Sequence, residues 1–246
     1  MPSEQSFADR IGKFVLMKEA CESMSPAFEP AAADIAIPAL VSFITTLHTC
    51  CTNVTSAATD LKNLTGPRAA SIKVITERVT RALSRVKSNR AWASQLPAVK
   101  TAADKARGVK PPKSAVTPSP AAPKAPAQKA RGHGGSGYRD VEGYLRDFIA
   151  AVAQCQGYDT GAPVEISLLT LRSLHDALKT ANIAVPEKAI MLQEAQADRL
   201  KVFVSKKPLP DGSASLHDRW GRIKNAVEAQ YGRTSAEFAR VWRIKY

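Results

Sequence analysis

Residues 109–137 read VKPPKSAVTPSPAAPKAPAQKARGHGGSG and separate two segments of helical pattern. This stretch contains six prolines, six alanines and four glycines, and it has no acidic or aromatic residue. A chain of this composition cannot bury enough apolar surface to fold, so we predict a disordered basic linker. The sequence therefore predicts three parts: a helical bundle over residues 1–108, a flexible linker over 109–137 and a second helical bundle over 138–246.

Composition predicts that both bundles are all-α. The chain has 246 residues, of which 44% are hydrophobic and 6% are aromatic. A core that is poor in aromatic residues and rich in Ala, Leu, Val and Ile favours packed helices over a β-sandwich. Each flanking segment is long enough to bury a modest core. We therefore expect two small antiparallel bundles of four to five helices each.

The two segments open with helices of the same pattern. Phe7, Ile11 and Phe14 fall on one face of a helix, as do the apolar residues from Val141 to Cys155. Offsets of 134 and 131 residues align the following pairs: Ile11 with Leu145, Phe14 with Phe148, Cys21 with Cys155, Leu40 with Leu171, Ser42 with Ser173, Leu47 with Leu178 and Thr49 with Thr180. The pattern suggests a tandem duplication. Chance similarity between amphipathic helices is the alternative, and the sequence alone leaves it open.

Glycine and proline residues place the expected helix boundaries. The Gly66–Pro67 pair predicts the end of a third helix, and Pro186 predicts the start of its counterpart. After the opening helices, we expect helices over residues 34–51, 54–64, 69–88 and 97–106 in the first segment, and over 164–181, 186–205, 213–230 and 235–241 in the second.

Positive charge exceeds negative charge in every part of the chain. Residues 1–108 carry 14 basic and 9 acidic side chains, the linker carries 5 and 0, and residues 138–246 carry 16 and 13, which gives a net charge of +13. Such a surplus attracts polyanions such as nucleic acid, and it also maintains solubility. Charge alone is therefore a weak functional signal.

The basic residues include a set that suits nucleic-acid binding. Arg78, Arg81 and Arg85 share one helix face, and the C-terminal cations alternate with Trp220 and Trp242, a mixture compatible with phosphate contacts and base stacking. The candidate contacts are Arg78, Arg81, Arg85, Lys110, Lys113, Lys124, Lys129, Arg131, Arg222, Arg240 and Arg243. The alternative is that these cations line solvent-facing helix surfaces while both tryptophans pack inward.

No pattern indicates catalytic, cofactor-binding or metal-binding residues. The four cysteines include no Cys-x-x-Cys pair, and His48 shares a helix face with Cys51 without further ligands. The glycines of residues 132–137 lack the Lys-Ser/Thr ending of a phosphate-binding loop. We therefore expect a protein that is not an enzyme and that uses no cofactor.

The amino terminus lacks the pattern of a signal peptide, and no apolar stretch approaches the roughly 20 residues of a membrane helix. We therefore expect a cytoplasmic protein with reduced thiols and no membrane contact.

The layout of the chain and the stretch from Tyr231 to Phe238, Tyr-Gly-x-x-Ser-x-Glu-Phe, resemble those of uncharacterised bacterial proteins with two tandem helical domains joined by a Lys/Pro-rich linker. The resemblance implies a bacterial cytoplasmic origin, and it transfers no activity to any residue.

The sequence thus favours a non-enzymatic interaction or scaffold protein that presents two tethered bundles to an unidentified protein partner. The alternative is a nucleic-acid-associated protein that binds phosphate backbones through its basic linker and Arg-rich helices. The sequence gives no indication of the oligomeric state.

Overall fold

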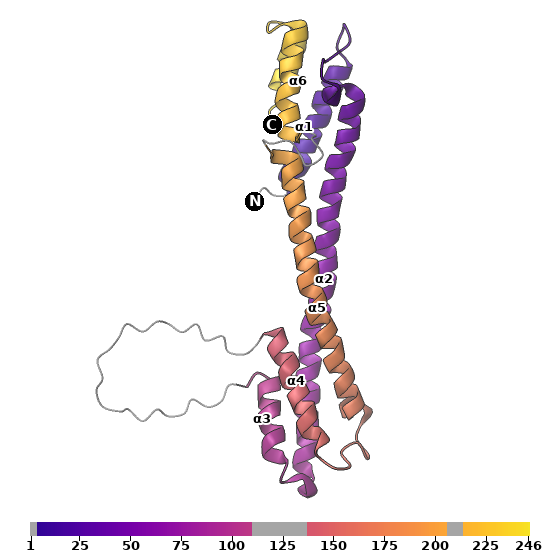
Figure 1. Ribbon diagram of the computed structural model, residues 1–246, viewed down its shortest axis with the longest axis vertical. Coiled ribbons are helices and arrows are strands. Elements are labelled where there is room, and N and C mark those ends of the chain that lie inside the picture. Colours follow the sequence, from indigo (N-terminus) through magenta and orange to yellow (C-terminus); the bar gives the residue numbers. More distant parts are fainter. Residues whose placement is uncertain (1–3, 110–136, 206–213) are drawn as a thin grey trace, which may run out of the picture. The chain divides into compact units, whose positions relative to one another are not determined.

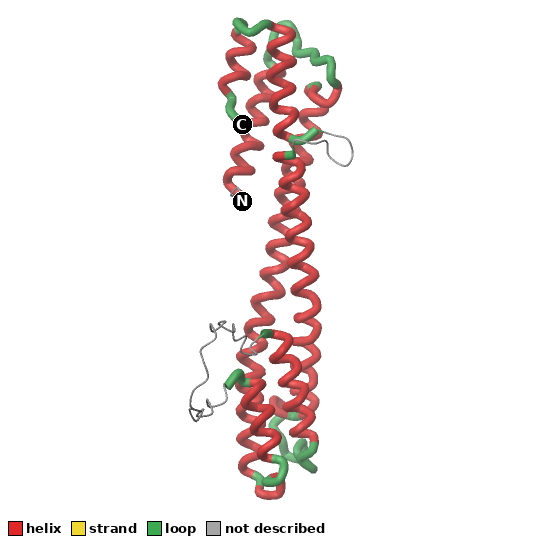
Figure 2. The backbone as a smooth tube through the Cα atoms, turned by 60° about the vertical axis from the view of Figure 1, so that its left-hand side comes forward, coloured by secondary structure: helices red, strands yellow, loops and turns green. Residues whose placement is uncertain are grey.

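The computed structural model describes residues 4–109, 137–205 and 214–246. Every regular element in these ranges is a helix, as Figure 2 shows, so the all-α prediction is confirmed for them. The predicted linker falls almost wholly in residues 110–136, outside the described ranges, together with Lys110, Lys113, Lys124, Lys129 and Arg131.

Figure 1 labels the longer described helices on the two sides of residues 110–136. Before this stretch lie α1 (Glu4–Glu22), the 3₁₀ turn η1 (Ala33–Ile35), α2 (Ile37–Ser88), η2 (Arg90–Trp92) and α3 (Leu96–Ala106). After it lie α4 (Tyr138–Ala153), η3 (Val164–Ile166), α5 (Leu168–Val204), α6 (Leu216–Tyr231) and α7 (Ala236–Arg243). The last two helices begin at serine caps, since the hydroxyls of Ser215 and Ser235 accept hydrogen bonds from backbone N–H groups three residues later. Such a cap contributes about 1 kcal/mol.

The predicted helix boundaries at Pro67 and Pro186 are wrong. Both prolines lie inside unbroken helices, Pro67 in α2 and Pro186 in α5, and both are exposed. A proline in a helix interior costs about 3 kcal/mol. Packing offsets this cost because buried and half-buried residues continue at helical spacing past Pro67, from Val54 through Leu61 to Ile75.

The described residues form two compact units that differ from the predicted domains. Unit 1 consists of Met1–Leu61 and Lys188–Tyr246, and unit 2 consists of Lys62–Glu187. Because α2 and α5 continue where breaks were expected, each of these helices contributes residues to both units. Each unit therefore contains helices from both sides of the linker, whereas the sequence predicted one bundle over 1–108 and another over 138–246.

Unit 1 is held together by buried aromatic rings. Phe14 of α1 is fully buried, and its ring centroid lies 5.9 Å from those of Phe43 in α2 and Trp220 in α6. Phe7 packs edge-on against Phe203 of α5 at 4.9 Å. Helix α7 packs on both α1 and α6. This core therefore joins the first helices of the chain to its last helices.

Unit 2 has a mostly aliphatic core, and α3 packs along α4 (Figure 1). Ile75 of α2 and Phe148 of α4 are both fully buried in it. Tyr158 is 2% exposed and donates its hydroxyl to the carbonyl of Ile166 at 3.0 Å. The ring of Trp92 lies 5.8 Å from that of Tyr158. This core also joins residues from both sides of the linker.

Residues that the sequence offsets align on the two sides of the linker are buried alike. Phe14 and Phe148 are related by the 134 offset, and both are fully buried. The 131 offset relates η1 to η3, and each of these turns buries an isoleucine and precedes a long helix. An offset of 141 then relates buried residues of α2 to those of α6: Ile75 with Leu216, Val79 with Trp220, Ala82 with Ile223 and Val86 with Val227. The pattern of buried residues along α2 thus matches that of α5 followed by α6.

Among the described helices, only α2 has the length and apolar composition to cross a membrane. This differs from the expectation that no apolar stretch approaches the length of a membrane helix. Only 22% of the qualifying 18-residue window is buried. Near the start of α2, Leu40 and Leu47 belong to the core of unit 1. The outward-facing hydroxyls of Thr45 and Thr49 donate to carbonyls four residues earlier. The absence of membrane contact remains a prediction.

Candidate functional site

The candidate nucleic-acid contacts within the described ranges are divided between the two units. Arg78, Arg81 and Arg85 lie on the part of α2 that belongs to unit 2. Those in unit 1 are Arg222 on α6, and Arg240 and Arg243 on α7.

Arg85 binds the loop between α4 and η3. Its Nε and Nη2 donate to the carbonyl of Tyr158 at 3.2 and 2.9 Å. Nη2 also donates to the carbonyl of Thr160 at 2.8 Å, and Nη1 donates to that of Gly161 at 3.2 Å. The guanidinium carbon lies 5.5 Å from the centre of the Tyr158 ring. The fold therefore accounts for an arginine at this position without a ligand.

Arg81 and Arg222 are equivalent at the 141 offset, and each faces an acidic residue of a 3₁₀ turn. Nη1 and Nη2 of Arg222 bond to the two carboxylate oxygens of Asp34 in η1 at 2.6 and 2.8 Å. Nη2 of Arg81 lies 3.9 Å from Oε2 of Glu165 in η3. Burial favours a higher pKa for Asp34, but the hydrogen bond and charge of Arg222 outweigh it and hold the pKa below the ordinary 3.8. Both arginines thus pair with the turn before a long helix.

The remaining arginines differ in their surroundings. Nη1 of Arg240 donates to the hydroxyl of Ser23 at 2.6 Å. Arg78 is half-buried, and Arg243 is exposed. The candidate contacts therefore include side chains engaged in the fold as well as side chains open to solvent.

A groove of about 530 Å³ lies between α1 and the N-terminal part of α2, within unit 1. Leu16 on this face of α1 is 56% exposed, and a methyl group built on Gly12 would meet nothing within 4 Å. The groove is lined by Glu4, Ala8, Ile11, Gly12, Val15, Leu16 and Glu19 of α1 and by His48 and Cys51 of α2. It is therefore largely apolar and open along α1.

A buried arginine pairs with one of the lining residues, Glu4. Arg199 of α5 is 5% exposed, and its Nη1 lies 2.6 Å from Oε2 of Glu4. Its guanidinium carbon lies 4.1 Å from the centre of the Phe7 ring. A buried cation is stable only when it is paired. Arg199 therefore fixes Glu4 at one end of the groove.

The two adjacent thiols of α2 remain protonated at neutral pH. Burial raises the pKa of Cys51 above the ordinary 9.0, and the charge of Arg199 lowers it by less. Burial likewise raises the pKa of Cys50, and the neighbouring Cys51 adds to this effect. A protonated thiol is a weak nucleophile. Cys51, the thiol that lines the groove, is therefore not activated for nucleophilic attack.

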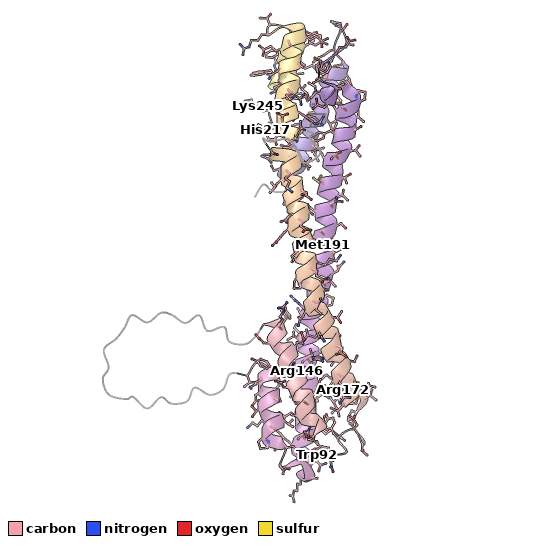
Figure 3. The ribbon with its side chains drawn as sticks, in the orientation of Figure 1. Trp92, Arg146, Arg172, Met191, His217 and Lys245 are labelled. Atoms are coloured by element: carbon pink, nitrogen blue, oxygen red, sulfur yellow. The ribbon has the colours of Figure 1, made fainter. Side chains whose placement is uncertain are left out.

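The equivalent face of α4 carries longer side chains than this face of α1. The correspondences at the 134 and 131 offsets are Ala8 with Glu142, Gly12 with Arg146 and Cys51 with Asn182. Arg146 lies on α4 in Figure 3 and is exposed. Glu142 accepts a hydrogen bond from Nδ2 of Asn182 at 2.8 Å. Polar side chains thus occupy, in unit 2, the positions that are small in unit 1.

The sequence reasoning missed this groove, although it noted that His48 and Cys51 share a face. The available signal was the 134 offset, which aligns Ala8 and Gly12 with two long side chains. Across the described ranges, no group of three or more His, Cys, Asp or Glu side chains could hold a metal ion. The chain matches no protein-family model, no curated protein and no solved structure.

Proposed function

We propose that the protein is a non-enzymatic interaction or scaffold protein, and that unit 1 binds a protein partner through the groove on α1. The observation that supports this proposal most directly is apolar exposure, since Leu16 is 56% exposed beside the open position at Gly12. Exposed apolar surface of this kind is a common feature of interaction sites. The protonated thiol of Cys51 supports a binding role over a catalytic one.

We further propose that the two sides of the linker are duplicates. The 131 offset relates further identical residues: Ile35 with Ile166, Val54 with Val185, Leu61 with Leu192 and Arg68 with Arg199. The last pair contacts corresponding positions by different interactions: the guanidinium of Arg68 lies 3.9 Å from the ring centre of Tyr138, and that of Arg199 forms an ion pair with Glu4. Tyr138 and Glu4 correspond at the 134 offset. Each duplicate would then supply its first helices to one unit and its last helices to the other, and the groove would mark a place where the duplicates have diverged.

Site-specific photo-cross-linking tests the role of the groove. A photoreactive amino acid at position 16 is expected to capture a discrete protein, whereas one at Ala150, the equivalent exposed position on α4, is not. The double variant Ala8→Glu/Gly12→Arg gives α1 the side chains that α4 carries and leaves the net charge unchanged. It should abolish capture at position 16. Equal capture at both positions, or capture that survives the double variant, would contradict the proposal.

Binding to nucleic-acid backbones is the second candidate, and the observation that favours it is the linker, with five basic and no acidic side chains. Fluorescence anisotropy of labelled DNA and RNA tests it, with the intact chain and with a chain lacking residues 110–136, from low to physiological salt. Submicromolar binding with a steep salt slope that weakens on deletion would support this function. No binding near physiological salt would rule it out.

A further inference from the structure

We infer that the partner of the α1 groove is an amphipathic helix whose apolar stripe is flanked by basic residues at both ends. This inference rests on the proposed function of the groove and names the chemistry of the partner. It follows from the length of the groove, the size of its side chains and the charge at its two ends.

The groove has the dimensions of a helix-binding site. Glu4 and Glu19 are 15 residues apart on α1, which at about 1.5 Å per residue is about 22 Å, or four turns. Between them, Ala8 and Gly12 lie one turn apart, and their small size lets a second helix approach the backbone of α1 closely. Leu16 lies one turn further along. A helix in this groove would place apolar side chains against α1 at i, i+4 and i+7 spacing.

The groove is too open for a small ligand. Small-molecule sites bury roughly 70–90% of the ligand surface. Here Ala8 and Gly12 are exposed and Leu16 is 56% exposed, so a small molecule would remain largely in water. A helix laid along α1 would instead cover these residues and Val15 together.

Acidic residues stand at both ends of the groove. The side chain of Glu4 is 65% exposed although it pairs with Arg199, so part of the carboxylate remains accessible to a partner. Glu19 is exposed at the other end. Both lysines of α1 are already engaged in ion pairs at 2.9 Å, Lys13 with Asp9 and Lys18 with Glu22. Basic residues of a partner would therefore be attracted to both ends of the groove.

The same charges disfavour a second copy of this chain as the occupant. If two α1 helices packed antiparallel about Gly12, Glu19 of each helix would approach Glu4 of the other. In a parallel arrangement, each glutamate would face its own equivalent. Like charges brought together at an interface oppose association. A partner with basic ends meets neither difficulty.

Designed peptides test the inference against the full chain. Two stapled helical peptides share one leucine stripe, which is flanked by lysines in the first and by glutamates in the second. We expect the lysine-flanked peptide to bind about tenfold more tightly in fluorescence anisotropy. Its lysines attract Glu4 and Glu19 at the two ends of the groove, whereas the glutamates of the other peptide are repelled by them. The variant Ala8→Glu/Gly12→Arg should abolish binding of this peptide. Glu19→Gln, at an exposed position, should reduce the preference for lysine while leaving the circular dichroism spectrum unchanged.

The other outcomes overturn the inference in different ways. Equal affinity for the two peptides would reject a basic partner and leave the groove as an interaction surface. Binding of neither peptide would reject the helical partner, and cross-linking from position 16 would then decide the proposed function separately. Sedimentation velocity of the full chain is measured in parallel. Self-association that is lost in Leu16→Ala would identify a second copy as the occupant and would also reject the inference.

Discussion

Replacing Arg85 with methionine should destabilise unit 2. In the native protein, the guanidinium donates to the carbonyls of Tyr158, Thr160 and Gly161 and so ties α2 to the loop between α4 and η3. Methionine keeps an unbranched apolar chain beside the ring of Trp92 but has no donor. The substitution therefore isolates the hydrogen bonds from the packing.

The expected loss follows from the burial of the acceptors. A hydrogen bond from a charged donor contributes about 1.5–3 kcal/mol. This range applies to Tyr158, which is 2% exposed. Thr160 and Gly161 are exposed, so water can replace the hydrogen bonds that their carbonyls lose. We therefore assign each of these two hydrogen bonds about 0.5 kcal/mol or less. The total is about 1.5–4 kcal/mol, or roughly 3–16 °C in Tm for a chain of this size.

Arg81→Met is the matched control on the same helix face. The side chain of Arg81 is 45% exposed, and its two carboxylate contacts are both 3.9 Å long, so its loss should cost under about 0.5 kcal/mol. Urea unfolding followed by circular dichroism compares the two variants, and hydrogen exchange of residues 154–162 locates the effect. Equal unfolding free energies for the two variants would refute the structural role assigned to Arg85. Loss of nucleic-acid affinity without destabilisation would instead favour phosphate binding by this residue.

Two further predictions concern unit 1. Asp34→Asn removes the ion pair with Arg222 and should cost about 1 kcal/mol at neutral pH in urea unfolding. Because the folded pKa of Asp34 lies below its ordinary 3.8, the stabilisation by this ion pair is fully present above pH 3.8. The difference in unfolding free energy between the variant and the native chain should therefore persist from pH 7 to about pH 4 and vanish as the pH falls further. A constant difference down to pH 2 would contradict the pairing. Burial raises the pKa of Cys21 to about 12, so alkylation at pH 8 should leave this thiol unmodified, while the half-buried Cys50 and Cys51 react slowly. Peptide mapping of the alkylated chain measures the three labelling rates. Rapid labelling of Cys21 in the native chain would contradict its burial.

Helical periodicity predicted most of the secondary structure from the sequence. The helices expected over residues 97–106 and 213–230 correspond to Leu96–Ala106 and Leu216–Tyr231. The expected break between residues 51 and 54 was wrong, since α2 runs through it. The other errors came from Pro67 and Pro186, whose local preference was taken to outweigh the apolar stripe that continues past them. A proline penalty of about 3 kcal/mol is small beside the packing of several buried side chains on either side of it. Missing these two continuations also concealed the composition of the two units.

The roles of the arginines were harder to predict. A helical wheel shows that Arg81 and Arg85 share a face, but it cannot show what lies opposite. The acceptors for Arg85 come from a loop more than 70 residues later in the chain. The tryptophans illustrate the same limit, since Trp220 is 4% exposed as the inward-packing alternative expects, whereas Trp242 is 52% exposed.

The groove could not be found by searching for motifs, because small residues produce it. Ala8 and Gly12 carry no chemical signature of their own. Their significance appears only when α1 is compared with α4, where Glu142 and Arg146 stand at the equivalent positions. The offset between the two segments was visible in the sequence, but only the structure shows that the face bearing these residues is open.

Each compact unit is assembled from helices on both sides of the linker, and cleavage of the linker tests this arrangement. A protease site is placed within residues 110–136, and the cleaved chain is examined by size-exclusion chromatography under native conditions. We predict that the two fragments elute together at the volume of the intact chain, because Phe14 packs with Trp220 in one core and Ile75 with Phe148 in the other. Two separate peaks, each retaining its helical circular dichroism, would contradict this arrangement and favour independent bundles over 1–108 and 138–246.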